Sequence, residues 1–345
     1  MKLKLSLILA LVITLVATVF WEIYWRNQGR LPNIDDNKNL WANQRDKLDK
    51  PNENDVTFIG SSRILYAIQS DIWEEETQTK PIMLAAQGGS PIPVFKDIVD
   101  NTAFSGTLIV GITPALFFST LHPQVDFIKR PQFLVDYHKK RTYAQRINHA
   151  LAVPLQKNFT FIRDGDEAWD SDVDLKTLIS HIYQDERGGP IFPPFNNFED
   201  ISLDRHMKMP KLVETDTAYA NSIKKVWTAI LSGDYPPPDV DGTISAFVEL
   251  SKTFRERGGN LILVRCPSDG LFRERETQDF PRKTFWDRLL IESNSKGYHY
   301  LDYQQFHNLF LPEWSHLATS DAQFFTRELI KLMKADNVIS NSKSN

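Results

Sequence analysis

The stretch that decides the fold is VTFIGSSRILYAI, residues 56–68. Its first four residues favour a buried strand, and they run into Gly60 before two serines, an arginine and a renewed apolar pattern. A strand that ends on glycine and leads into a helix is typical of folds in which the two alternate. The turn has two interpretations. It is an ordinary strand-to-helix connection, or it presents a serine for chemistry.

Similar short apolar runs recur outward from this stretch, at residues 81–89, 106–114 and 260–267. Each run stops at glycine or proline. Residues 243–259 (TISAFVELSKTFRERGG) have the spacing of an amphipathic helix that ends at a Gly-Gly pair. Buried strands that alternate with helices predict an α/β fold with three layers, α/β/α, around a central and mostly parallel sheet.

The composition excludes several classes of site. The chain has 345 residues, a formal net charge of -4 and an apolar content of 41%, which suits a sizeable globular core. This charge gives no footprint for nucleic acid. Cys266 is the single cysteine, so an intrachain disulfide and a cysteine metal cluster are both excluded.

The amino terminus predicts a membrane anchor over residues 1–26. Lys2 and Lys4 precede an uncharged run over residues 5–21, and an aromatic cluster and Arg26 follow it. A cleaved signal peptide is the alternative, but the run offers no convincing cleavage site. We favour an uncleaved anchor of a plasma or inner membrane. The flanking positive charges are nearly balanced, and we place the bulk of the chain outside the cytoplasm, on the periplasmic side.

The remaining chain divides by composition. Residues 27–54 are polar and predict a stalk, residues 55–335 predict the α/β domain, and the last ten residues, 336–345, predict a disordered tail. Within the domain, residues of about 120–240 are broken by proline-rich stretches and predict a mainly helical insertion. Ser320 and Gln323 form a capping-box pattern, which predicts a final helix from about Asp321 to Met333 with Ser320 as its N-cap.

Candidate site residues follow the predicted strands, because ligands bind beyond the carboxyl ends of parallel strands. Ser62 follows the first strand, and Gly88 and Thr113 follow the next two. A serine hydroxyl needs a histidine base that is oriented by another group, and Glu313 and His316 supply both from one short loop. Backbone N–H groups at Ser62 and Gly88 would face a developing oxyanion. Ser61 is the alternative nucleophile.

These segments resemble the SGNH, or GDSL, hydrolase and acyltransferase superfamily over roughly residues 55–335, with the insertion unmatched. GSSR at 60–63 is similar to its first block, AAQGGS at 85–90 to its glycine block, and EWSH at 313–316 to its Asp-x-x-His block. The closest similarity is to membrane-tethered members that accompany cell-envelope acylation. The resemblance implies that Ser62 is the nucleophile, His316 the general base and Glu313 its orienter, without a metal or organic cofactor.

The sequence departs from the family pattern at two positions. Thr113 stands where the third block has an asparagine that donates to the oxyanion, and loss of such a donor costs on the order of 10²-fold in rate. Glu313 replaces an aspartate and adds one methylene. Two arginines near the predicted strand ends, Arg63 and Arg265, are weaker candidates for binding an anionic substrate.

The leading hypothesis is a membrane-anchored, extracytoplasmic serine esterase or O-acyltransferase that acts on an ester of a cell-envelope glycan. Two alternatives stay open. One is a non-catalytic protein of the same fold that binds a glycan or a membrane O-acyltransferase partner. The other is a structural anchor in which residues 60–63 form only a turn. The sequence does not name the acyl group or the acceptor.

Overall fold

The computed structural model describes residues 2–27, 29–52, 54–118, 125–162, 182–183, 186–187, 198–233, 235 and 237–339. Its centre is a five-stranded sheet in which every neighbouring pair of strands is parallel. In spatial order the strands are β2 (Ile82–Met83), β1 (Val56–Ile59), β3 (Thr107–Gly111), β8 (Asn260–Arg265) and β9 (Lys296–His299). The predicted α/β fold with a central parallel sheet is confirmed.

Both faces of the sheet are buried. Successive strand residues alternate between two hydrophobic cores: Phe58, Ile109 and Ile262 belong to one, and Ile59, Val110 and Leu263 to the other. All six side chains are 0% exposed. Burial on both faces explains why these strands have continuous apolar runs rather than alternating apolar and polar residues.

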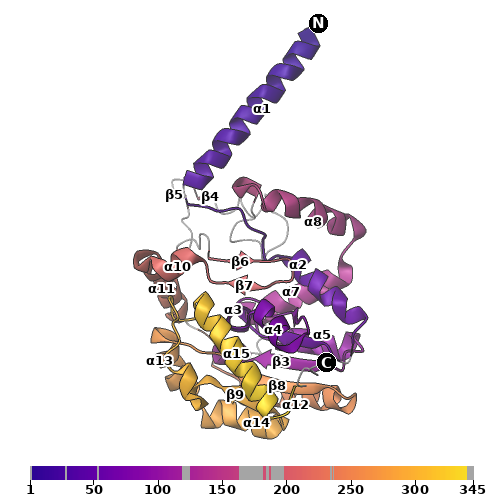
Figure 1. The fold of residues 1–345 in the computed structure, drawn as a ribbon, viewed down its shortest axis with the longest axis vertical. Helices are drawn as coiled ribbons and strands as arrows, with labels where there is room; N and C mark the ends of the chain where they lie inside the picture. Colours follow the sequence, from indigo (N-terminus) through magenta and orange to yellow (C-terminus); the bar gives the residue numbers. More distant parts are fainter. Residues whose placement is uncertain are drawn as a thin grey trace.

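Helices cover the two faces and make the outer layers (Figure 1). Ile64, Trp73 and Phe325 fill the core on one face, from α3 (Ser62–Ala67), α4 (Ser70–Thr77) and α15 (Thr319–Ala335). Phe95, Phe247 and Leu289 fill the core on the other, from α5 (Ile92–Asn101), α12 (Val240–Glu256) and α14 (Arg288–Ser293). Shorter helices connect these elements, namely α6 (Pro114–Phe117) and α13 (Gly270–Asp279).

The predicted helix over 243–259 corresponds to α12, which begins three residues earlier and ends before Gly258. The final helix is different at its start. α15 begins at Thr319 with Ala318 as N-cap, so Ser320 is not the cap that we predicted. The Thr319 N–H donates to Glu214 Oε1 at 2.5 Å. A carboxylate from a distant helix, α10 (Lys211–Thr215), thus takes the place of a local capping box.

The prediction of a stalk over 27–54 is wrong for much of that segment. Residues 38–45 form α2 (Lys38–Arg45), followed by a 3-10 turn, η1 (Asp46–Asp49). Leu40 and Trp41 are 0% exposed, and the Trp41 Nε1–H donates to the Leu84 carbonyl at 3.0 Å. A buried ion pair joins Arg45 to Asp97 of α5 at 2.6 Å. The sequence of this segment is mostly polar because only a minority of its residues face the core. That minority is buried.

A long helix, α1 (Lys2–Asn27), projects from one end of the domain (Figure 1). Residues 3–27 are long and apolar enough to cross a membrane, and the apolar segment has 0% of its residues buried in the fold. This gives weak support to the predicted anchor, because α1 is the type of helix that can span a membrane.

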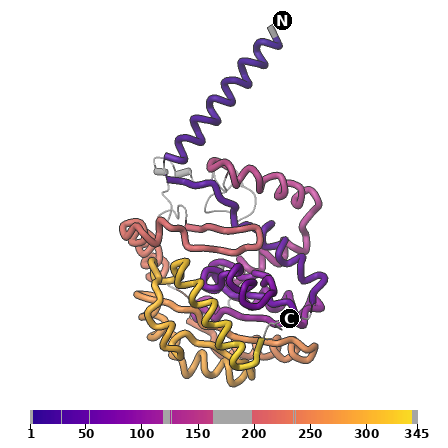
Figure 2. Tube along the Cα trace, in the orientation of Figure 1, coloured from indigo at the N-terminus to yellow at the C-terminus, as the bar shows by residue number. Residues whose placement is uncertain are grey.

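The insertion contributes four helices and a hairpin within the described residues. These are α7 (Asp126–Lys140), α8 (Tyr143–Gln156), α10, α11 (Thr217–Leu231), and the hairpin of β6 (Asp200–Ile201) and β7 (Met207–Lys208). A 3-10 turn, η2 (Thr160–Ile162), follows α8, and the short strands β4 (Ile182–Tyr183) and β5 (Glu186–Arg187) pair with each other. Figure 2 shows the hairpin crossing the domain beside α3 and α4. The rest of the predicted insertion lies outside the described residues.

The carboxyl-terminal segment is folded further than predicted. Val338 and Ile339 pack against the first core, and the Val338 carbonyl accepts from Asn260 Nδ2 at 2.8 Å. The disordered tail predicted over 336–345 is therefore wrong for residues 336–339, and residues 340–345 lie outside the described residues. Three short turns precede α15: η3 (Lys283–Asp287), η4 (Tyr300–Asp302) and η5 (Gln304–Phe306).

Candidate active site

Gly60 forms the turn that ends β1 and begins α3. Its φ is +148°, and a Cβ at this position would lie 2.9 Å from the Gly111 carbonyl oxygen and 2.8 Å from Ile64. Only glycine therefore lets the ends of β1 and β3 approach so closely. The turn places Ser61 at the N-cap of α3 and Ser62 at its first residue.

The two serines have different roles in this turn. The Ser61 hydroxyl is buried, caps α3 by accepting from the Arg63 N–H at 3.4 Å, and bonds Thr113 Oγ1 at 2.7 Å. Ser62 keeps a partly exposed side chain, and its Oγ lies 2.8 Å from His316 Nε2. Of the two candidate nucleophiles, the structure brings Ser62 and not Ser61 to the histidine.

His316 bridges Ser62 and Glu313 through its two ring nitrogens. Its Nδ1 lies 2.9 Å from Glu313 Oε1, and the same oxygen accepts from the His316 backbone N–H at 2.5 Å. His316 is 2% exposed and Glu313 0% exposed. The three residues that the sequence predicted as nucleophile, base and orienter therefore form one hydrogen-bonded line, in which Glu313 contacts Nδ1 and Nε2 is directed to Ser62.

The loop that carries the histidine has an unusual backbone. Trp314 has a φ of +78°, a conformation that bulky side chains rarely adopt. Its carbonyl accepts from the Asp269 N–H at 2.8 Å, which holds the strained residue in place. This backbone turns the chain so that Glu313 and His316 face each other across three residues, and local strain of this kind clusters at functional sites.

Aromatic side chains surround the imidazole. Ring centroids of Tyr66, Phe198 and Trp227 lie 4.4, 5.6 and 6.0 Å from the His316 ring. The Trp227 indole Nε1–H also donates to Glu313 Oε2. The insertion therefore supplies part of the site. Sequence reasoning missed Trp227 because one tryptophan in an amphipathic helix carries no signal for such a role. The position of Tyr66 near the site could have been predicted from the sequence, since this residue lies one helical turn after Ser62.

The candidate oxyanion donors leave the sheet from neighbouring strands. The Ala86 N–H donates to the Gly60 carbonyl at 2.8 Å, so the loop with Gly88 continues beside the Ser62 turn. Gly88 has a φ of +59°, and a Cβ there would lie 2.9 Å from Arg130 Nη1. In the described part of the chain, neither the Ser62 nor the Gly88 N–H donates to another protein group. The two N–H groups are therefore still candidate donors to an oxyanion.

Thr113 is at the predicted strand end but its hydroxyl is already bonded to Ser61 Oγ. The pair of hydroxyls links the turn after β1 to the turn after β3. Either hydroxyl of this pair can be the donor, and where Thr113 accepts, its own proton is left for another acceptor. Thr113 therefore stays a candidate donor, and its described contact is with the helix cap.

The arginines that we predicted as substrate ligands have another role. The buried Arg63 and Arg265 guanidiniums both pair with the Glu276 carboxylate of α13. Burial opposes ionisation of Glu276, but the two arginines outweigh it and hold the pKa of this carboxyl below its usual value. Arg63 also donates from Nε to Ser315 Oγ at 3.3 Å. Arg63 thus joins the Ser62 turn to the histidine loop. Both arginines are bonded within the protein, to Glu276, where the sequence had predicted contacts with substrate.

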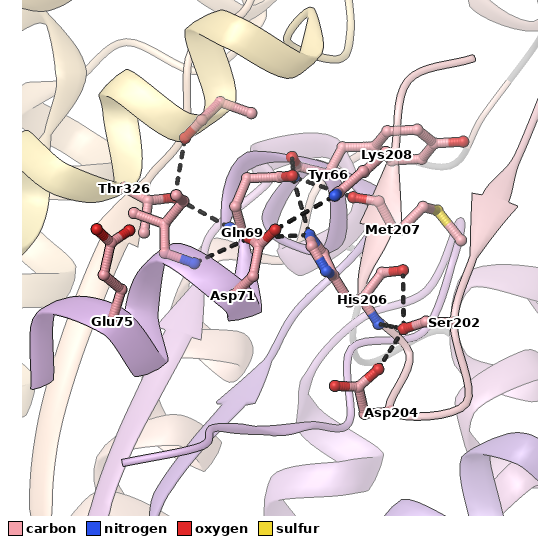
Figure 3. Close-up of polar contacts among 12 residues, drawn as sticks. Tyr66, Gln69, Asp71, Glu75, Ser202, Asp204, His206, Met207, Lys208 and Thr326 are labelled. Atoms are coloured by element: carbon pink, nitrogen blue, oxygen red, sulfur yellow. Dashed lines mark hydrogen bonds and ion pairs between the residues drawn. The ribbon is translucent and has the colours of Figure 1, made fainter. Parts of the chain in front are cut away.

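A second polar cluster holds the other end of α3 (Figure 3). Gln69, between α3 and α4, donates from its side chain to the Tyr66 and Met207 carbonyls at 3.0 Å each. Its backbone N–H donates to Thr326 Oγ1 of α15 at 3.0 Å. His206 of the insertion lies 2.9 Å from Gln69 Oε1. These contacts join the hairpin, α3 and α15, and they keep α3 in register behind Ser62.

Two further features lie apart from the serine. A cavity of about 510 Å³ is lined by residues 32–34 and by the β6–β7 hairpin, and neither Ser62 nor His316 lines it. Among the described residues, Asp46, Asp49 and His138 are close enough to share a metal ion. Arg45 and Arg146 pair with these carboxylates, so positive charge already balances the group.

The comparisons with known proteins identify no relative. No family model matches the chain, and no curated protein matches it either.

Proposed function

We propose that this protein is a membrane-anchored serine esterase or O-acyltransferase in which Ser62, His316 and Glu313 form the catalytic triad. One observation carries the proposal: the His316 imidazole bridges the Ser62 hydroxyl and the Glu313 carboxylate through Nε2 and Nδ1. A structural histidine has no need of this arrangement, whereas a serine nucleophile does.

The chemistry follows from these contacts. Ser62 Oγ attacks the carbonyl carbon of an ester while its proton moves to His316 Nε2. The oxyanion that forms accepts from the Ser62 and Gly88 N–H groups. The ester C–O bond then breaks, and the leaving alcohol takes the proton from His316, which leaves an acyl group on Ser62. Water or an acceptor hydroxyl attacks this acyl-enzyme, with His316 again as base, so hydrolysis and transfer share the same intermediate.

Glu313 stabilises the charged form of the base. Its Oε1 accepts from the His316 ring, and its Oε2 accepts from Trp227. Because these partners surround a fully buried carboxylate, it is oriented before substrate binds and needs no rearrangement during proton transfer.

The substrate class rests on the resemblance and on the anchor. The similarity of residues 60–63, 85–90 and 313–316 to the SGNH superfamily supports an O-acyl ester of a cell-envelope glycan as the substrate. An apolar α1 at the amino terminus supports a single-pass protein of the inner or plasma membrane. The resemblance supports a periplasmic location for the domain. A membrane O-acyltransferase is the partner that would supply or receive the acyl group.

The test is acylation of the full chain in detergent micelles. Incubation with a 4-nitrophenyl acyl ester should release nitrophenol and add one acyl mass to a peptide that contains Ser62. Ser62→Ala should lose both signals. Ser202→Ala is the matched control, because its hydroxyl belongs to the second polar cluster, and it should keep both. An acyl adduct that persists in folded Ser62→Ala protein would contradict the proposal.

The second candidate is a non-catalytic protein of the same fold that binds an envelope glycan or a membrane partner. The contact of Thr113 with Ser61 favours it, because the hydroxyl of one predicted oxyanion donor already makes a hydrogen bond to another side chain. Glycan binding that survives Ser62→Ala and His316→Ala, without ester turnover by the wild type, is the outcome that would support this candidate.

A further inference from the structure

One side of α8 has an apolar stripe. Tyr143, Ile147, Leu151 and Leu155 recur every four residues along the helix, and Phe159 continues the series beyond its end. In chain order their exposed fractions are 79, 43, 66, 45 and 40%. Single exposed apolar residues are common on protein surfaces, but an aligned row along one helix marks an interaction site.

The stripe points away from the domain. The inner face of α8 contains His149 and Gln156, which are 5% and 3% exposed, and Val153, which packs against the first core. Gln156 Nε2 donates to Asp35 Oδ2 at 2.5 Å. At about 100° per residue, His149 and Gln156 lie on the side of the helix opposite the middle of the stripe. Among the described residues, the domain thus packs against the opposite side of α8 and the stripe stays exposed.

The end of α8 is fixed to the base of α1. The Glu22 carboxylate accepts from the Thr160 and Phe161 N–H groups at 3.1 and 3.2 Å, and Arg26 donates to the Asn158 carbonyl at 3.0 Å. These contacts join residues just after α8 to the last turns of the apolar helix. Figures 1 and 2 show α8 extending sideways from this junction, across the direction of α1.

The junction lies at the aromatic end of α1. Trp21, Tyr24 and Trp25 contact one another there, with ring centroids 5.2–5.7 Å apart. Aromatic clusters of this kind lie at the boundary between the lipid acyl chains and water. A helix that is joined to this level and crosses the spanning helix lies along the membrane surface.

The charges around α8 also suit a lipid surface. Residues 142–162 contain no Asp or Glu, and they include Lys157 and Arg146, of which the second also pairs with Asp46. Positive charge on a segment that itself contains no acidic residue favours the headgroups of anionic phospholipids.

We infer that α8 lies in the headgroup layer of the membrane that α1 spans, with its apolar stripe toward the acyl chains. The occupant of the stripe is an anionic phospholipid surface. Two contacts, α1 and α8, then hold the domain against the membrane and set its orientation. The inference requires α1 to be a membrane span and does not depend on the proposed catalysis.

The experiment places a fluorescent probe on the stripe. Full-length Leu151→Cys protein is labelled with a nitrobenzoxadiazole maleimide and reconstituted into liposomes of phosphatidylethanolamine and phosphatidylglycerol. Burial raises the pKa of the Cys266 thiol to about 12, so this native cysteine stays unlabelled. Ile291→Cys on α14 is the matched control, since it is 78% exposed and lies at the end of the domain far from α1 (Figure 1).

Lipids with a nitroxide at the headgroup should quench the probe at position 151 several-fold more than the probe at position 291. Replacement of phosphatidylglycerol by phosphatidylcholine should weaken this difference. Equal quenching at the two positions would overturn the inference, as would a chain that does not float with the liposomes. Shielding of position 151 that requires an added second protein would also overturn it, because the stripe would then be a protein docking site. Tyr143→Cys, labelled in place of Leu151→Cys, should show the same strong quenching. Agreement of the two positions would show that the quenching does not come from a disturbance by the Leu151→Cys substitution.

Discussion

Two clusters in this molecule contain a serine, a histidine and a carboxylate. In the first, the His316 ring joins Ser62 and Glu313 through its two nitrogens, and the carboxylate is 0% exposed. Every polar group of the line is directed along a path that a proton can follow, from hydroxyl to imidazole. Aromatic rings enclose the imidazole and limit the access of water.

The second cluster, shown in Figure 3, has the same residue types in another arrangement. The Ser202 hydroxyl accepts from the His206 backbone N–H at 3.2 Å, and within the described part of the chain it makes no hydrogen bond with the imidazole. The ring directs Nε2 to Gln69 at 2.9 Å and to Asp71 at 3.5 Å. The residue types alone therefore do not define a triad geometry. That geometry requires a histidine ring whose two nitrogens each contact one of the other two residues.

Removal of the nucleophile should give the largest contrast between the clusters. Ser62→Ala is expected to lower ester turnover by roughly 10⁴-fold or more, because the covalent route is lost. Ser202→Ala should leave turnover within about twofold of the wild type, since the Ser202 side chain is only partly buried and hydrogen-bonds Asp204 and the His206 backbone. Initial rates of 4-nitrophenyl ester hydrolysis compare the two. Equal losses in both variants would show that the comparison fails.

The carboxylate should come next. Glu313→Gln keeps the side-chain shape but presents an amide to the imidazole, and we expect turnover to fall by about 10³-fold through the wrong tautomer of His316. Asp71→Asn is the matching change in the second cluster and should leave turnover unchanged. A Glu313→Gln enzyme with wild-type kcat would mean that Glu313 only fills space.

The sequence predicted those parts of the site whose residues lie close together in the chain, and it missed contacts between distant segments. Ser62, Glu313 and His316 were predicted because a strand-end turn and a three-residue spacing are local patterns. Trp227 and Phe198 come from the insertion, whose fold is set by contacts with distant segments. Arg63 and Arg265 were predicted as substrate ligands because their partner, Glu276, has no local signal on α13.

The same limit explains the errors in the fold. Four strands of the central sheet were predicted from continuous apolar runs that stop at glycine or proline, and α12 was predicted from its amphipathic spacing. The N-cap of α15 is decided by Glu214, which lies 105 residues before Thr319 in the chain. The buried α2 was predicted as a stalk because its polar residues outnumber the few that reach the core.

A substitution at Trp227 should have a smaller effect on turnover. It distinguishes the contribution of the indole hydrogen bond from that of the ring's volume. Trp227→Phe keeps an aromatic ring beside His316 but removes the donor to Glu313 Oε2. We expect a decrease in kcat of about 10-fold, which corresponds to the loss of one hydrogen bond to a charged group. The KM for a small ester should stay constant. A change in KM alone would place Trp227 in substrate binding instead.

The smallest effect should be on stability, in the second cluster. Burial lowers the pKa of the His206 imidazole below its usual value. The unfolded state then binds more protons below about pH 6.5, so this contribution to stability is present above that pH and is lost as the pH falls. His206→Gln keeps a donor for Gln69 without titrating. Between pH 7 and pH 5, the free energy of unfolding of His206→Gln should therefore decrease less than that of the wild type.

Urea denaturation at the two pH values measures this difference. His299, whose pKa burial lowers to about 3, should contribute equally in both proteins and cancel in the comparison. An identical loss of stability in wild type and His206→Gln would contradict the assignment of this contribution to His206. Ester turnover at pH 7 should be the same in both, because His206 holds α3 and does not contact Ser62.

The most direct measurement of the central claim is the site of covalent labelling by a serine-directed fluorophosphonate. The full-length protein in detergent would be treated with the probe, digested and analysed by mass spectrometry, with His316→Ala as the control. The bridging imidazole predicts a label on Ser62, none on Ser202, and loss of the Ser62 label in folded His316→Ala protein. A folded wild-type protein without label on Ser62, or with equal label in the His316→Ala protein, would contradict an activated serine at this site.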